Sequence, residues 1–194
     1  MKKRLPEFRL GFSFFAVAAF LLSGDLYRNY LYALGFSLLH EAGHLIAMLL
    51  FGVVPEKIVF EIHGIRIDKS LSALSYGREC IVALAGPLMN ALFMLIFIGD
   101  TSSLLFSVNM CLLIVNLLPV SSLDGGRLLF CLVAMLKGVA SAERAVTFSG
   151  IIAAFLLCVA LLMLLLSGNT NASVVIFTVI VIFSVVSDLA VRHL

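Results

Sequence analysis

The chain has 194 residues, of which 62% are apolar and only 12% are charged. Soluble domains carry about 45–50% apolar and about 25% charged residues, so this composition excludes a disordered chain, a coiled coil and an ordinary water-soluble enzyme. It indicates a protein whose solvent is largely the lipid bilayer. The net charge of +2 gives no basis for binding nucleic acid.

Six apolar runs follow one another along the chain, and each is a candidate for a membrane-spanning helix, which needs about 20 residues. The hydropathy pattern therefore predicts an all-α membrane protein, a polytopic bundle of about six transmembrane helices with the fourth one interrupted. The first run also fits the core of a cleaved signal peptide, but its small residues lie inside the run, which favours an uncleaved helix. The runs are 10–22, 31–54, 80–98, 104–118 with a continuation at 128–136, 145–166 and 174–190.

The segment after the second run changes its period. Apolar and polar residues alternate from Ile58 to Ile67, with a break at Gly64, which predicts a small β-hairpin or a bent strand. Two interpretations stay open for it. It is either a structural surface element or an edge at which an extended substrate adds a strand.

Basic residues predict the orientation in the membrane. If the N-terminus is cytoplasmic and six spans alternate, twelve of the 13 Lys and Arg residues lie on the cytoplasmic side and only Arg28 lies outside. This bias follows the positive-inside rule. We therefore expect an integral multi-pass protein with both termini and the active site towards the cytoplasm.

The second apolar run contains ionisable residues that are costly at bilayer depth. His40-Glu41-Ala42-Gly43-His44 reads H-E-x-x-H. On a helix His40 and His44 lie on one face, where both imidazoles can reach one metal ion. Glu41 projects about 100° away, close enough to hold a water bound to that ion.

Catalytic zinc takes three protein ligands and keeps one position for water, so a third ligand is needed. Asp124 is the candidate, because it follows Pro119 and precedes Gly125 and Gly126. Pro119 cannot continue a helix, and the glycines permit a tight turn. The alternative is that Asp124 lies in a plain cytoplasmic turn that caps the next helix.

The four cysteines and the two remaining histidines do not indicate a metal or catalytic site. Cys80, Cys111, Cys131 and Cys158 show no C-x-x-C spacing and are interpreted as small buried hydrophobic residues. His63 and His193 are interpreted as surface residues.

Four motifs follow one another along the chain, namely His40–His44, Gly86-Pro87-x-x-Asn90, Asn116–Pro119 and Leu123–Gly126. Together they resemble the site-2 proteases, the intramembrane zinc metalloproteases of peptidase family M50. The resemblance covers about residues 30–136 and is nearest to the compact type without a PDZ domain, such as stage IV sporulation protein FB. No cystathionine-synthase-type domain is expected either, so residues 1–194 are interpreted as a single membrane-embedded protease domain. The family pattern usually has a proline where this chain has Ser122.

The resemblance implies a set of site residues and one Zn²⁺ per chain. It implies His40, His44 and Asp124 as the zinc ligands, Glu41 as the catalytic acid/base, and Asn116 as a polar group near the substrate or the oxyanion. Asn90 is implied to hold the core helices together or to stabilise the site.

The implied activity is zinc-dependent hydrolysis of a peptide bond within or near a transmembrane segment. The partners would be a membrane-tethered protein substrate, the lipid bilayer and a regulatory membrane protein. Such regulated intramembrane proteolysis would take place in a bacterial cytoplasmic membrane, with sporulation as one pathway.

Two other functions stay open. A catalytically inactive relative would bind membrane partners with the same fold, although the intact Glu41 argues against it. A metal or proton transporter would use the His, Glu and Asp residues as a pathway, but these residues cluster instead of forming a relay, and the chain shows no repeated halves.

Overall fold

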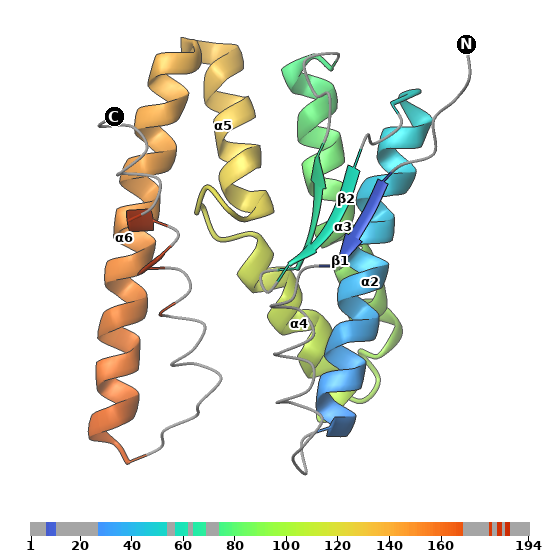
Figure 1. Cartoon of the computed structure of the whole chain (residues 1–194). Helices are drawn as coiled ribbons and strands as arrows, with labels where there is room; N and C mark the ends of the chain where they lie inside the picture. The colour runs from blue at the N-terminus through green and yellow to red at the C-terminus, as the bar shows by residue number, and fades with distance from the viewer. Residues whose placement is uncertain are drawn as a thin grey trace. The chain divides into compact units, whose positions relative to one another are not determined.

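The computed structural model describes residues 7–10, 27–53, 57–61, 64–68 and 74–168, and five positions in the last apolar run. These residues form five helices and three strands (Figure 1). The chain divides into two compact units, residues 1–114 and 115–194. Each unit is built around its own helix pair.

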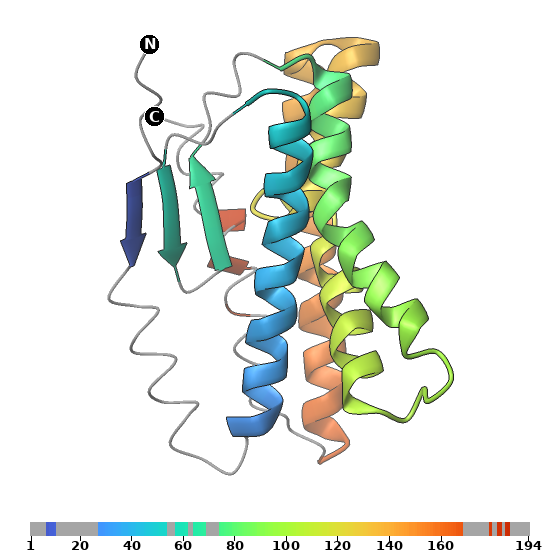
Figure 2. The same ribbon diagram turned by 90° about the vertical axis from the view of Figure 1, so that its right-hand side faces the viewer.

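The first unit is built on α2 (Tyr27–Leu50) and α3 (Tyr76–Ile96), which lie side by side (Figure 2). Gly43 permits their close approach, because a Cβ there would lie 2.6 Å from the Ala85 carbonyl oxygen and from the Met89 side chain. Met48 and Val82 are fully buried in the core between them. Helix α4 (Leu104–Asn116) follows α3 and leads into the second unit.

A three-stranded sheet completes the first unit. It consists of β1 (Glu7–Leu10), β2 (Lys57–Glu61) and β3 (Gly64–Asp68), in the order β1-β2-β3. Strand β1 is parallel to β2, with Glu7 opposite Lys57, and β3 is antiparallel to β2, with Asp68 opposite Lys57. Strand β3 lies nearest to α2 (Figure 2). The central strand β2 is therefore paired on both edges.

The second unit is a helical hairpin of α5 (Asp124–Lys137) and α6 (Val139–Leu166), which run in opposite directions (Figure 1). Gly138 makes the turn with a φ of 80°, a value that favours glycine. The loop residue Val120 is fully buried against Ala153 of α6 and Val185. The loop before α5 is thereby packed into the core of this unit.

Among the described residues, three helices are long and apolar enough to cross a membrane, namely 31–50, 76–96 and 139–166. Large apolar side chains on their outer faces are exposed, including Leu92 on α3 and Phe155 on α6. Water disfavours such surfaces and lipid accepts them. The chain is therefore a membrane protein.

The predicted fold class, an all-α bundle of about six transmembrane helices, is wrong, whereas the antiparallel pair of β2 and β3 agrees with the predicted small hairpin. The part of the chain that the structure describes has five helices, of which three are candidate spans. Residues Glu7–Leu10 form a strand that pairs with β2. The fourth apolar run yields two short helices, α4 and α5, because its backbone breaks between Asn116 and Asp124. Most of the runs 10–22 and 174–190 lies outside the described residues.

Candidate metal centre

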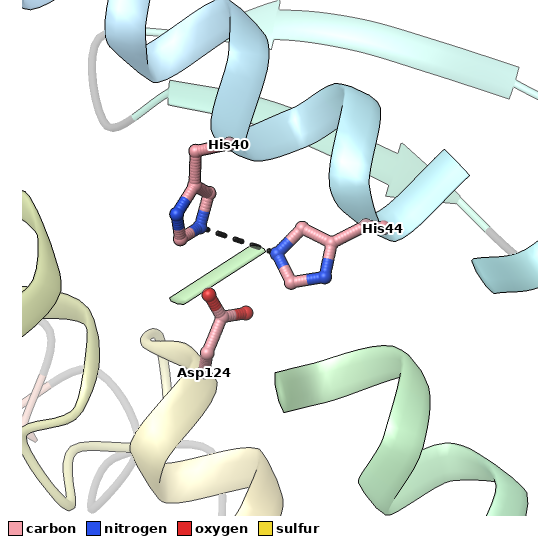
Figure 3. A group of neighbouring side chains, drawn as sticks. All are labelled: His40, His44 and Asp124. Carbon is pink, nitrogen blue, oxygen red and sulfur yellow. Dashed lines mark hydrogen bonds between the residues drawn. The ribbon is translucent and has the colours of Figure 1, made fainter. Parts of the chain in front are cut away.

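His40 and His44 lie one turn apart on α2 and present their imidazoles on the same side of the helix (Figure 3). Both are buried, with exposed fractions of 3% and 6%. Their Nε2 atoms are 3.2 Å apart, and the ring planes stand at 82° to each other. The H-E-x-x-H spacing thus brings two nitrogen atoms to one point.

Each imidazole is held through its other nitrogen atom. The Nδ1 of His44 donates to the carbonyl oxygen of Val82 at 2.6 Å, and the Nδ1 of His40 donates to Oδ1 of Asn90 at 2.5 Å. A neutral imidazole carries one N–H, so a proton on Nδ1 leaves a lone pair on Nε2. Metal-bound histidines are usually held in this way by a second hydrogen bond.

The two Nε2 atoms fit a zinc ion. They lie within hydrogen-bond distance of each other at 3.2 Å, and a metal ion would bind both nitrogen atoms in place of this contact. Tetrahedral zinc with bonds of about 2.0–2.1 Å separates two nitrogen ligands by about 3.3–3.4 Å. The observed separation therefore agrees with shared coordination of one ion.

Gly86 of α3 faces the two imidazoles. A Cβ at this position would lie 2.6 Å from Nε2 of His40 and even closer to Nε2 of His44. Any side chain here would occupy the space in front of the two nitrogen atoms. Gly86 thus keeps the space beside the two Nε2 atoms free of a side chain.

Asp124 is the first residue of α5 and is half-buried (Figure 3). A carboxylate in the first turn of a helix is stabilised by the positive end of the helix dipole. The preceding residue, Leu123, is extended, with φ −112° and ψ 163°, so the helix begins sharply at Asp124. The carboxylate is therefore positioned by the first turn of α5.

The glycines after Asp124 are required for close packing of the backbone. A Cβ on Gly125 would overlap the carbonyl of Leu117, and a Cβ on Gly126 would overlap that of Val120. Neither glycine has a positive φ. The glycines are therefore not required for a left-handed backbone conformation. They are required because they let the loop lie directly against the first turn of α5.

A hydrogen bond from α6 holds the same loop. The hydroxyl of Ser149 donates to the carbonyl oxygen of Pro119 at 2.8 Å. Two short backbone bonds, from Val120 to Leu118 and from Leu123 to Val120, tighten the turn. The loop that precedes Asp124 is thus fixed at several points.

The other predicted residues are placed as follows. Glu41 is half-buried on α2, next to His40, and Asn116 is the half-buried last residue of α4. Cys80 and Cys131 are buried as expected, whereas Cys111 and Cys158 are exposed on apolar helices. His63 and His193 lie outside the described residues.

Sequence reasoning missed Asn109, which is fully buried on α4. Its amide accepts a hydrogen bond from Asn90 at 3.2 Å and donates to the carbonyl of Leu105 at 2.9 Å. A signal was present, because Asn109 is a strongly polar side chain inside an otherwise apolar helix, where such groups usually have partners.

Comparisons with known proteins agree with the resemblance. Residues 98–157 match the profile of peptidase family M50, and this stretch includes Asn116 and Asp124. The site-2 protease from Methanocaldococcus jannaschii has a similar structure, with a TM-score of 0.64, 22% sequence identity, and coverage of 93% of this chain and 89% of that chain. Comparison with curated protein sequences gives no match. The structural likeness shows a shared fold, and residues 98–157 resemble peptidase family M50.

Proposed function

We propose that this chain, recognised as a relative of the site-2 proteases, hydrolyses peptide bonds within or near the transmembrane segment of a membrane-tethered protein. The observation that carries the proposal is the buried pair His40 and His44, whose Nε2 atoms lie 3.2 Å apart on a candidate membrane span. Family M50 supports a metalloprotease. Regulated intramembrane proteolysis of this kind is the function that these features favour.

The proposed ligands of one Zn²⁺ are His40, His44 and Asp124. Each offers one ligand atom, an imidazole nitrogen or a carboxylate oxygen. This set of three protein ligands is typical of catalytic zinc, which keeps its fourth position open. When bound, zinc polarises the scissile carbonyl and makes water a nucleophile at neutral pH.

Glu41 is the proposed general base and acid. It follows His40 on α2 and is half-buried. Glu41 accepts the proton of the attacking water while the new C–O bond forms. It then delivers that proton to the leaving amine as the C–N bond breaks, so the proton balance closes. Asn116 is the proposed donor to the oxyanion.

Substrates would bind in an extended form, because a helical substrate hides its carbonyls in hydrogen bonds. Strand addition at residues 58–62 does not fit the sheet, because β2 is paired on both edges. Among the described strands, β1 and β3 are the two edge strands, and β3 lies nearest to α2, which carries His40 and His44. The outer edge of β3 is therefore the proposed position for an added strand.

The proposed setting is a bacterial cytoplasmic membrane with both termini and the active site towards the cytoplasm. The distribution of the basic residues supports this orientation. The same proposal includes a single protease domain of the compact type of the family. It also includes a regulatory membrane partner and a role such as sporulation.

The test uses purified protein, Zn²⁺ and a designed single-span peptide that carries a fluorophore and a quencher. We expect cleavage by the wild type and a loss of at least about 100-fold in Glu41→Gln, because general acid–base catalysis contributes about 10²–10⁴-fold. Zinc content should be unchanged in this variant, since Glu41 is not a proposed ligand.

Glu143→Gln is the matched control, because Glu143 is exposed on α6, and it should cleave normally. Cleavage that persists in Glu41→Gln would exclude the proposed mechanism. Zinc transport into liposomes by Glu41→Gln, without cleavage by the wild type, would favour the transporter instead. Binding of the peptide without any cleavage would favour the inactive relative.

A further inference from the structure

Two buried asparagines connect His40 to the backbone of α4. The hydrogen bonds run from Nδ1 of His40 to Oδ1 of Asn90, from Nδ2 of Asn90 to Oδ1 of Asn109, and from Nδ2 of Asn109 to the carbonyl oxygen of Leu105. Both asparagines are fully buried, with an exposed fraction of 0%. The three bonds therefore lie within the protein interior and join α2, α3 and α4.

This chain of bonds has a fixed direction. A backbone carbonyl only accepts, so the Leu105 oxygen requires the NH₂ group of Asn109 on its side. The Asn109 oxygen then faces α3 and requires the NH₂ group of Asn90. The Asn90 oxygen in turn faces His40 and requires a proton on Nδ1.

The two histidines differ in what holds them. His44 donates to the carbonyl oxygen of Val82, which is part of the α3 backbone and cannot present a donor. His40 donates to a side-chain amide, which presents a donor in place of an acceptor if it turns by 180°. His40 thus needs a further group that fixes the orientation of Asn90.

We propose that Asn109 is a positioning residue that orients the Asn90 amide and thereby keeps the His40 proton on Nδ1. The role in metal binding rests on the proposed function, whereas the tautomer itself belongs to the metal-free protein. Asn109 acts through Asn90 and touches neither the metal position nor the peptide bond.

The test is ¹⁵N NMR of the metal-free protein with ¹⁵N-labelled histidine, which distinguishes protonated from unprotonated ring nitrogens. We expect the wild type to show protonated Nδ1 on both His40 and His44. In Asn109→Leu, a similar-sized apolar replacement, His40 should gain a population protonated on Nε2. His44 should keep its wild-type signals, because the Val82 carbonyl still holds it.

The double variant Asn90→Asp with Asn109→Leu gives the rescue. A carboxylate presents an acceptor in either orientation, so Asp at this position needs no orienting partner. We expect the His40 tautomer to return to the wild-type form in the double variant. A merely structural role of Asn109 predicts no such return, because the packing defect is still present.

Zinc affinity provides the second readout. Loss of a partner that orients a metal ligand typically lowers affinity about 10–100-fold, so we expect a loss of this size in Asn109→Leu and recovery in the double variant. If the wild type fails to bind zinc but the tautomers behave as expected, the proposed function fails and the positioning role stands.

Three outcomes would overturn the positioning role. They are an unchanged His40 tautomer in Asn109→Leu, an equal change at His40 and His44, and no return in the double variant. If Asn109→Leu does not fold, Asn109→Asp takes its place. It keeps an oxygen towards Asn90 and should retain the wild-type His40 tautomer, so a changed tautomer in Asn109→Asp would also contradict the proposal.

Discussion

The spacing of two histidines on α2 places their Nε2 atoms 3.2 Å apart inside a candidate membrane span. Burying two polar rings there is costly unless each polar atom has a partner. The Val82 carbonyl and the Asn90 amide satisfy the Nδ1 atoms. The two Nε2 atoms, which contact each other, are the proposed metal-binding atoms of the pair.

Gly86 gives a direct test at this scale. In Gly86→Ala the added methyl would lie on the Nε2 atoms of His40 and His44, so we expect zinc binding and cleavage to fall at least tenfold. Zinc content of the purified protein measures this loss. Gly35→Ala is the control, because a Cβ at Gly35 meets nothing within 4 Å, and it should bind zinc like the wild type. Equal zinc binding by both variants would show that Gly86 does not keep the position open.

At the scale of elements, the loop between α4 and α5 positions Asp124. The loop lies against the first turn of α5, where Gly125 and Gly126 leave no room for a side chain, and Ser149 of α6 holds the Pro119 carbonyl. The first turn of α5 and the loop therefore form one packed piece. Changes in that packing should move the carboxylate.

Gly125→Ala tests this packing. Its methyl would overlap the Leu117 carbonyl, so we expect destabilisation by about 1–3 kcal/mol, typical of overpacking, together with weaker zinc binding. Thermal unfolding in detergent measures the stability. Gly150→Ala is the matched control, because a Cβ there meets only Val185 at an ordinary 3.5 Å. An unaltered unfolding temperature in Gly125→Ala would contradict the packing account.

The sequence predicted the local features of the site better than the fold. The H-E-x-x-H motif and the helix break before Asp124 follow from residue spacing and from Pro119, so they could be inferred without a structure. The pairing of Glu7–Leu10 with β2 could not, because parallel pairing joins segments about 50 residues apart and leaves no local pattern. The contact between Asn90 and Asn109 was missed because amide partners on separate helices have no sequence spacing of their own.

At the scale of the whole molecule, the distribution of basic residues predicts which ends of the helices face the cytoplasm. Helix α6 has Arg144 near its start, whereas the segment at its far end, 167–173, is uncharged. Its 28 residues span about 42 Å, which is enough to cross the bilayer. The start of α6 should therefore be cytoplasmic and its end external.

Cysteine labelling tests this orientation. In a background without native cysteines, Glu143→Cys and Ser167→Cys place a thiol at exposed positions near opposite ends of α6. In intact cells we expect a membrane-impermeant maleimide to label Ser167→Cys but not Glu143→Cys. Lysed cells should show labelling of both. Labelling of Glu143→Cys alone in intact cells would reverse the proposed sidedness.

The most direct test of the shared zinc site is X-ray absorption spectroscopy at the zinc edge of the purified protein. We predict one zinc ion per chain with two imidazole nitrogens and oxygen ligands at about 2.0–2.2 Å. Asp124→Ala should lose most of its zinc or show an altered oxygen shell, whereas Glu41→Gln should give the wild-type spectrum. Full zinc occupancy with an unchanged ligand shell in Asp124→Ala would contradict coordination by His40, His44 and Asp124.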